Sequence, residues 1–173
     1  ATPTYLNLPM ETREPAIGAL ISAAKDRATV YQIVLDHYPL LIAQILRAIG
    51  SAREGGILLH CHAGKDRTGI IVSLLLGLVG VPQAMIAADY AESQVCLWPL
   101  WQAIVEKVGG EANADFWLKP TATAAMMHSL LAHLDNRYGS VTHYLLATGL
   151  TDEELTRVRS RLLVQPTKES RHS

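Results

Sequence analysis

Most of the chain places apolar residues three and four positions apart, which is the spacing of an amphipathic helix. This spacing runs over 14–24 and 29–49, and Pro39 divides the longer stretch into two predicted helices. The segment 68–79 is apolar around nearly its whole circumference and predicts a buried helix. Capping and turn residues bound further predicted helices over 82–93, 120–138, 140–147 and from 151 onward. The pattern therefore predicts a mainly helical chain.

Two short runs are instead typical of strands. Thr4–Leu8 favours β structure and ends at Pro9, and the apolar run Ile57–His60 follows two glycines. A strand as apolar as the second run is typical of a parallel sheet that helices cover on both faces. Two strands alone do not form a stable sheet. We therefore expect an α/β fold with a central, mostly parallel sheet flanked by helices and a helix-rich C-terminal half. Strands that complete the N-terminal part of this sheet are expected to precede the sequence; the alternative is a reduced chain that reaches the same fold with fewer strands.

Length and composition limit the organisation of the chain. Its 173 residues, 49% of them hydrophobic, suffice for one core. We expect a single domain over 1–165 that lacks part of its N-terminal segment, and a frayed tail over 166–173. The 15 basic and 16 acidic side chains give a net charge of -1, which argues against a nucleic-acid partner or an anionic membrane surface. The longest apolar stretch, 70–81, contains a serine and two glycines, so no stable membrane insertion is expected.

Cysteine usage bears on the compartment. Cys61 and Cys96 lack the number and spacing of a disulfide framework and predict free thiols in a reducing compartment, by default the cytoplasm. Because the sequence begins at Ala1 without an initiator methionine, secretion by way of a removed leader stays open. Nothing in the sequence indicates the oligomeric state.

A polar loop follows the second predicted strand and leads directly into the helix over 68–79. Its sequence is His-Cys-His-Ala-Gly-Lys-Asp-Arg-Thr over 60–68. Backbone N–H groups of such a loop point inward and the helix N-terminus adds partial positive charge, so the loop is typical of an anion-binding site. Gly64 lets the backbone turn without a Cβ clash.

Within this loop Cys61 and Arg67 are the candidate catalytic residues. The loop dipoles and the guanidinium are expected to lower the pKa of Cys61 and yield a nucleophilic thiolate. Arg67 can bind two equatorial oxygens of a tetrahedral dianion. The pair predicts attack on phosphorus and a phosphocysteine intermediate that water hydrolyses, with no metal and no cofactor. The remaining substrate-binding residues are expected to be His62, Ala63, Gly64, Lys65 and Thr68, with Thr68 also donating to the departing thiolate.

The string His-Cys-x-x-Gly-x-x-Arg-Thr-Gly over 60–69 resembles the signature of the protein tyrosine phosphatase superfamily. The fuller Ala-Gly-Lys-Asp-Arg over 63–67 is similar to the bacterial atypical dual-specificity branch, as are the stretches 89–93 and 138–163. The resemblance implies a phosphatase acting on phosphotyrosine, with phosphoserine, phosphothreonine and phosphoinositides as further candidate substrates. It also implies an upstream strand of the Ile-Asp-Leu-Arg kind, which this sequence does not contain.

The sequence leaves open which residue protonates the leaving oxygen. Asp66 is either this general acid or a helix N-terminal residue that braces the loop, and Asp26 and Asp36 are further candidates. The resemblance implies an acid from a separate upstream loop, so the acid is alternatively expected in residues that precede the sequence.

Other features also carry two interpretations. Lys65 either favours highly anionic substrates or is a solvated lysine near a helix start. His60 and His62 flank the nucleophile, but no paired Cys or His spacing completes a zinc site, and His60 is expected to orient the loop by hydrogen bonding. The aromatic residues concentrated over 97–118 form either a lid over the phosphate pocket or part of the core.

Two functions of other classes stand as alternatives. A phosphate-binding module would recognise phosphorylated partners without turnover, if the acid is lacking. Sulfur transfer by a rhodanese-like loop is disfavoured by the helical stretch 138–163. The expected partners are therefore phosphorylated proteins or phosphoinositides.

Overall fold

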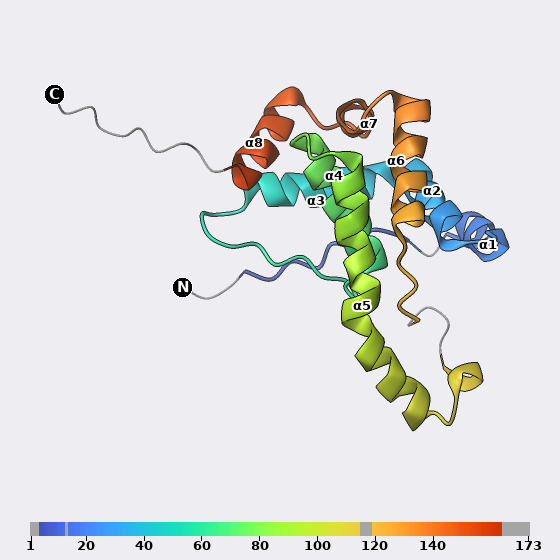
Figure 1. Ribbon diagram of the computed structural model, residues 1–173. Coiled ribbons are helices and arrows are strands. Elements are labelled where there is room, and N and C mark those ends of the chain that lie inside the picture. Colours follow the sequence, from blue (N-terminus) through green and yellow to red (C-terminus); the bar gives the residue numbers. More distant parts are fainter. Residues whose placement is uncertain (1–3, 13, 115–118, 164–173) are drawn as a thin grey trace.

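The structure is a computed structural model and describes residues 4–12, 14–114 and 119–163. Over these residues the chain is built from α-helices and one short 3-10 helix (Figure 1). The elements are α1 (Pro15–Ala23), α2 (Arg27–His37), α3 (Pro39–Ser51), α4 (Asp66–Leu78), α5 (Gln83–Lys107), η1 (Glu111–Asn113), α6 (Ala124–Tyr138), α7 (Val141–Ala147) and α8 (Asp152–Leu162). The predicted tail, 166–173, lies outside the described residues.

The expectation of a central parallel sheet is wrong, since no strand occurs in the part of the chain that the structure describes. Thr4–Leu8 and Ile57–His60 form no hydrogen-bonded ladder. The second run is not a buried strand, because Ile57 is 41% and Leu58 87% exposed. A strand needs a neighbour to accept and donate its backbone hydrogen bonds, and neither run has one here. Over the described residues the fold is therefore all-α.

The helix boundaries follow local chemistry. The predicted break at Pro39 is confirmed: α2 ends at His37, α3 begins at the proline, and the two helices meet at 81°. Asp26 caps α2 by accepting a hydrogen bond from the Thr29 N–H. The predicted capping box is also confirmed, because the Thr151 and Glu154 side chains each bind the other residue's backbone N–H at the start of α8.

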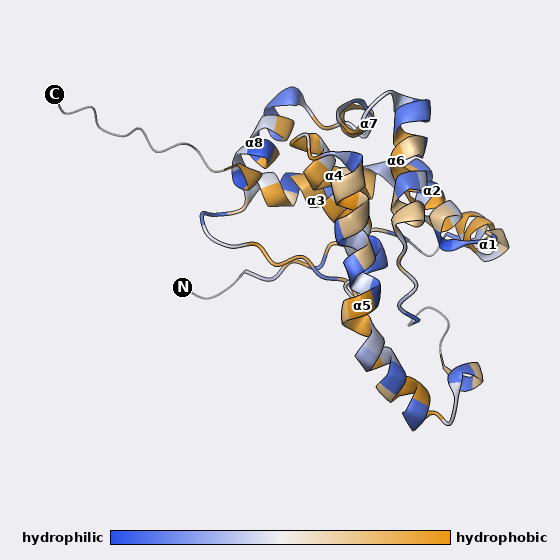
Figure 2. Ribbon diagram, in the orientation of Figure 1, coloured by the Kyte–Doolittle hydropathy of each residue, from blue (hydrophilic) through white to orange (hydrophobic). Residues whose placement is uncertain are grey.

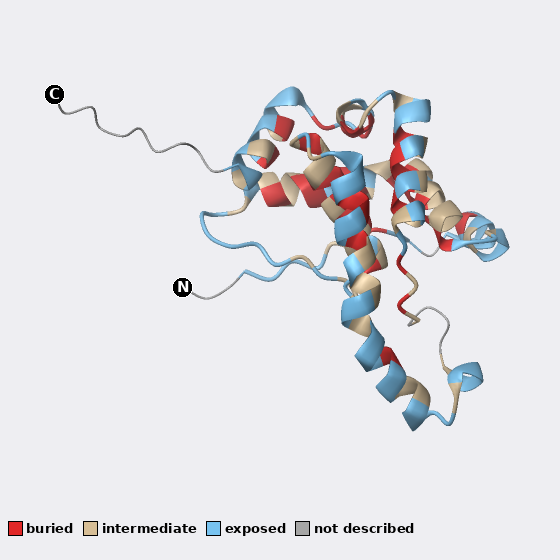
Figure 3. Cartoon of the chain, in the orientation of Figure 1, coloured by how far each residue is buried: buried red, intermediate tan, exposed pale blue. Residues whose placement is uncertain are grey.

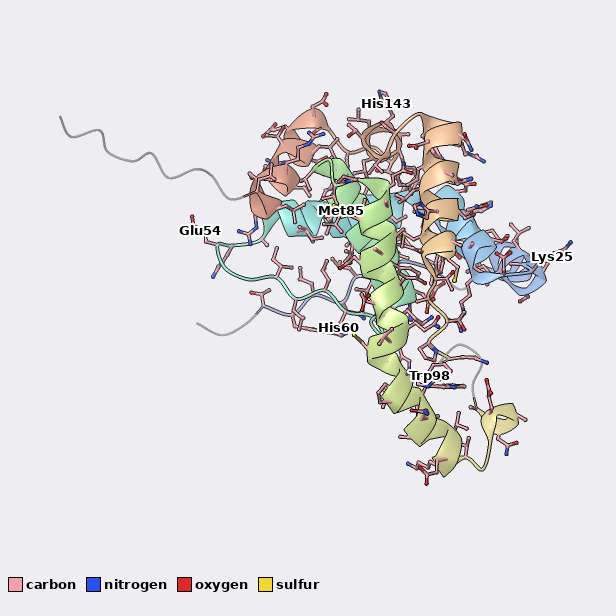
Figure 4. The ribbon with its side chains drawn as sticks, viewed as in Figure 1. Lys25, Glu54, His60, Met85, Trp98 and His143 are labelled. Atoms are coloured by element: carbon pink, nitrogen blue, oxygen red, sulfur yellow. The ribbon has the colours of Figure 1, made fainter. Side chains whose placement is uncertain are left out.

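Helix α5 is longer than the predicted 82–93. It continues as one long helix to Lys107 (Figure 1). Pro99 lies inside it, where the ring removes one backbone donor. The distal half of α5 therefore contains part of the aromatic stretch 97–118, with Trp98 exposed (labelled in Figure 4) and Trp101 buried. Residues 115–118 of that stretch lie outside the described residues, and the choice between lid and core stays open.

The core lies where α3, α4 and α6 turn their apolar faces toward the other helices (Figures 2 and 3). Leu46, Leu74 and Leu134, one from each helix, are fully buried. Helix α3 also packs on α8, and α5 on α6. The core therefore holds the N-terminus of α4, and with it the end of the polar loop, against α2 and α5.

None of the described helices is by itself long and apolar enough to span a membrane. Helices α2 and α3 reach the required length and composition only as a pair, and the pair is sharply bent. The cytoplasmic location stays a prediction.

Candidate active site

The polar loop joins an extended, exposed segment to the first turn of α4. Helix α4 begins at Asp66, two residues earlier than the sequence pattern predicts. Gly64 has a φ of +68°, a left-handed conformation that side chains with a Cβ rarely adopt. An added Cβ would meet nothing within 4 Å, so the backbone conformation rather than crowding requires glycine here.

The Cys61 thiol is half-buried and faces hydrogen-bond donors. Its burial works to raise the pKa of the thiol, but hydrogen bonds from the Thr68 hydroxyl and from the backbone N–H groups of Thr68, Lys65 and Gly64 outweigh it, and the pKa is lowered. The buried Thr68 hydroxyl has no oxygen or nitrogen partner among the described residues, which leaves it available to the sulfur. The donors of the loop therefore favour the thiolate form of Cys61.

Arg67 lies on the first turn of α4 and is exposed. Its Nη1 is 3.4 Å from the Glu11 Oε1, so the guanidinium already contacts a carboxylate from the N-terminal segment. It is not among the main causes of the Cys61 shift, which come from the loop donors. A guanidinium held by one exposed carboxylate can exchange that partner for an incoming dianion at small cost, because exposed ion pairs contribute little free energy.

The histidines differ in their contacts. The His60 Nδ1 lies 3.0 Å from the Cys61 carbonyl oxygen, and since a carbonyl only accepts, the ring N–H donates to the loop backbone (His60 is labelled in Figure 4). His62 is exposed and Ala63 is half-buried. No group of three or more His, Cys, Asp or Glu side chains in the described ranges is arranged to hold a metal ion.

Lys65 is neither solvated nor directed into open space. Its side chain is fully buried, and its Nζ lies 2.9 Å from the Asp66 Oδ1 and 3.4 Å from the Thr121 carbonyl oxygen. Burial lowers the pKa of Lys65, while the negative charges of Asp66 and Cys61 act in the opposite direction. The lysine therefore places a buried cation close to the thiolate.

A small cavity of about 140 Å³ adjoins the loop between α4 and α5. Gly64, Lys65 and Thr68 line it from the loop side, and Asp89 and Ser93 line it from α5. Asp89 is exposed. The Asp89 carboxylate of α5 therefore lies at the edge of the loop.

The sequence profile described as the tyrosine phosphatase family matches residues 2–164. The chain belongs to the tyrosine phosphatase family. This confirms the resemblance drawn from the loop, and the match runs through every described helix rather than through the loop alone.

Curated relatives from the tyrosine phosphatase family are also similar to the chain. A tyrosine-protein phosphatase from Nostoc commune is 34% identical over 135 residues, which cover 74% of this chain and 46% of the relative. The triple specificity protein phosphatase PtpB of Mycobacterium tuberculosis is 31% identical over 122 residues, covering 62% and 44%. A putative tyrosine-protein phosphatase from Cupriavidus necator is 29% identical over 143 residues, covering 80% and 52%. The chain thus spans about half the length of the curated relatives that it matches.

In this tyrosine phosphatase chain, the three aspartates proposed as general acids are all engaged in structural contacts. Asp26 is the cap of α2, and its pKa is lowered by the Thr29 N–H. Asp36 binds His133, Tyr138 and Arg137. The Asp66 Oδ1 accepts hydrogen bonds from Tyr31 and Lys65, which are contacts of a bracing residue.

Sequence reasoning missed the residues that surround Asp66. Arg27 and Tyr31 lie one turn apart on α2, and Tyr90 comes from α5. Arg27 is buried, donates to the carbonyl oxygens of Lys119 and Thr121, and has its Nη1 3.8 Å from the Asp66 Oδ1. Arginine and tyrosine one turn apart are ordinary in a helix, so no sequence signal separates these two from surface residues.

Proposed function

We propose that this chain hydrolyses phosphotyrosine monoesters through a phosphocysteine intermediate on Cys61. The observation that carries the proposal is the set of donors that face the Cys61 sulfur, from Gly64, Lys65 and Thr68, which lower its pKa. A thiolate at the start of a helix, with an exposed arginine two positions after a buried lysine, is suited to attack on a bound dianion.

The reaction has two steps. The thiolate attacks phosphorus, an S–P bond forms, and the P–O bond to the tyrosine breaks as its oxygen takes a proton from a general acid. Water then attacks phosphorus, the S–P bond breaks, and inorganic phosphate and the thiolate are released. The loop N–H groups and the Arg67 guanidinium stabilise the equatorial oxygens in both steps, and the Thr68 hydroxyl stabilises the departing thiolate in the second.

Phosphoserine, phosphothreonine and phosphoinositides are proposed as further substrates. One relative carries triple specificity in its name, which supports broad selectivity. The buried Lys65 ammonium adds positive charge near the loop without filling the site. His62 and Ala63 complete the proposed phosphate-binding loop, so the charge and the backbone rather than a particular leaving group determine binding.

We assign Asp66 to bracing the loop rather than to proton transfer, because its Oδ1 is occupied by Tyr31 and Lys65. Asp89 is the carboxylate that lines the cavity beside Gly64 and Thr68. It is therefore the first residue to test as the acid, by Asp89→Asn, whose effect should be larger on a phenyl phosphate than on p-nitrophenyl phosphate, a substrate with a better leaving group.

The direct test is hydrolysis of p-nitrophenyl phosphate and of a phosphotyrosine peptide by the purified chain. Cys61→Ser should reduce kcat by at least ~10³-fold, as expected on loss of a nucleophile. Vanadate should inhibit competitively, and acid quenching during turnover should trap phosphate on Cys61. Full activity in Cys61→Ser would refute the mechanism.

The engaged aspartates favour one second function, a phosphate-binding module without turnover. It predicts that the unmodified chain binds a phosphotyrosine peptide tightly while releasing no phosphate. Arg67→Lys should abolish this binding, because a lysine lacks the planar pair of donors.

A further inference from the structure

A chain of hydrogen bonds runs from α5 through α2 to the first residue of α4. The Tyr31 hydroxyl lies 2.5 Å from the Asp66 Oδ1 and 2.6 Å from the Tyr90 hydroxyl. A carboxylate only accepts, so the single Tyr31 proton goes to Asp66 and Tyr90 donates to the Tyr31 oxygen. The direction of donation is therefore from Tyr90 to Tyr31 to Asp66.

Both tyrosines keep their protons near neutral pH. Burial, reinforced by the charge of Asp66, raises the pKa of Tyr31. Burial also raises the pKa of Tyr90, to about 12. The two rings meet edge to face, with centroids 6.3 Å apart, and Tyr90 additionally packs against Gly69 of α4. The hydroxyls are thus fixed by packing as well as by hydrogen bonds.

The same Asp66 oxygen holds the Lys65 ammonium. Lys65 is fully buried, and its ammonium donates to Asp66 and to the Thr121 carbonyl oxygen. A buried ammonium needs such acceptors, since losing a partner in the interior leaves an uncompensated charge. If Asp66 rotates away, we expect the ammonium to leave its position.

Lys65 is connected to Cys61 in two ways. Its backbone N–H donates to the sulfur, and its charge interacts with the thiolate. Movement of the Lys65 side chain therefore changes the electrostatic interaction at the nucleophile. The ionisable groups around this network are Arg27 and Tyr31 from α2, Tyr90 from α5, and Asp66 and Cys61 themselves. The neighbouring Arg67–Glu11 ion pair joins α4 to the N-terminal segment.

We propose that Tyr31 is a positioning residue that, through Asp66, fixes the buried Lys65 ammonium beside the Cys61 loop and so keeps the sulfur ionised. The consequence for turnover rests on the proposed phosphatase function. The consequence for the thiol does not, because it concerns the loop without substrate.

The test is the pH dependence of Cys61 alkylation by iodoacetamide in the full chain carrying Cys96→Ser, since Cys96 is exposed and would also react. Tyr31→Phe should move the midpoint of alkylation upward by about half a unit or more, which corresponds to a roughly threefold loss of thiolate below the midpoint. At pH 6, kcat/KM should fall by about the same factor, and the loss should recover as the pH rises.

Tyr144→Phe is the matched control. Tyr144 is buried in the same core, and its hydroxyl donates to the Leu35 carbonyl oxygen, also on α2, at 2.9 Å. This variant removes a buried hydroxyl that donates to α2 but leaves the contacts of Asp66 unchanged. Its alkylation midpoint should therefore match that of the parent chain.

An alkylation midpoint for Tyr31→Phe that equals those of the parent and of Tyr144→Phe would overturn the proposal. If Tyr31→Phe does not fold, Tyr90→Phe replaces it, because this variant removes the donor to Tyr31 and should shift the midpoint in the same direction by a smaller amount; no shift there would equally overturn it. A chain with the expected midpoints but no turnover would instead count against the proposed phosphatase function.

Discussion

At the scale of single residues, the Cys61 sulfur is surrounded by hydrogen-bond donors of its own loop. Burial alone would hold this thiol protonated, yet four hydrogen-bond donations, one from a hydroxyl and three from the backbone, lower its pKa. Because a thiolate is the reactive form, the reactivity of Cys61 should rise with pH and level off at a lower pH than that of an ordinary cysteine, whose pKa is about 8.5.

The Thr68 hydroxyl can be tested separately from the backbone donors. Thr68→Val keeps the shape of the side chain and removes the hydroxyl that donates to Cys61, so the alkylation midpoint should move to higher pH and hydrolysis of the phosphoenzyme should slow. Thr148→Val is the control, because it also removes a buried threonine hydroxyl, but one that donates to the Leu145 carbonyl oxygen. An unchanged midpoint in Thr68→Val would show that the backbone N–H groups suffice.

At the scale of elements, the contact between α4 and α5 sets the position of Tyr90 behind the loop. A Cβ added to Gly69 of α4 would meet the Tyr90 ring at 2.8 Å, closer than real Cβ atoms approach. The missing side chain therefore lets α5 come close enough for the Tyr90 hydroxyl to reach Tyr31.

Gly69→Ala should destabilise the chain and raise the Cys61 alkylation midpoint, although alanine favours a helix over glycine by about 1 kcal/mol. Gly18→Ala in α1 is the matched control, because nothing lies within 4 Å of its added Cβ. It should raise the free energy of unfolding by about 0.5–1 kcal/mol and leave the site unchanged. Urea denaturation of both variants checks the prediction, and equal stabilisation in the two would contradict the close packing of α4 on α5.

At the scale of the whole molecule, helices distant in sequence hold the loop. Helix α6 packs on α2, α5 and α7, and α3 packs on α8, so the elements that carry Tyr31, Tyr90 and the loop share one core. Stability and site geometry are therefore linked through α6, the helix that contacts both α2 and α5.

Leu134→Ala, at a fully buried position of α6, should reduce the free energy of unfolding by about 2–5 kcal/mol. Leu40→Ala, at a position of α3 that is 71% exposed, should change it by less than about 0.5 kcal/mol. Denaturation in urea measures both values. Similar losses in the two variants would mean that α6 is not central to the core.

The sequence alone determined the features that depend on residues close together in the chain: the helical periodicity, the helix caps and the loop motif. It predicted the break at Pro39, the capping box at Thr151, the free Cys61 thiol in a loop before α4, and the phosphatase family. Helix starts and a backbone that encircles a sulfur are local, because each needs only a few consecutive residues.

Only the tertiary structure decided which distant groups meet. The run Ile57–His60 has the composition of a buried strand, but a strand exists only where a neighbour supplies hydrogen bonds, and none does so in the described residues. The contact of Lys65 with Thr121 and that of Asp66 with Tyr31 likewise join the loop to residues many positions away. Such contacts are fixed by packing between helices, and no pattern along the chain records them.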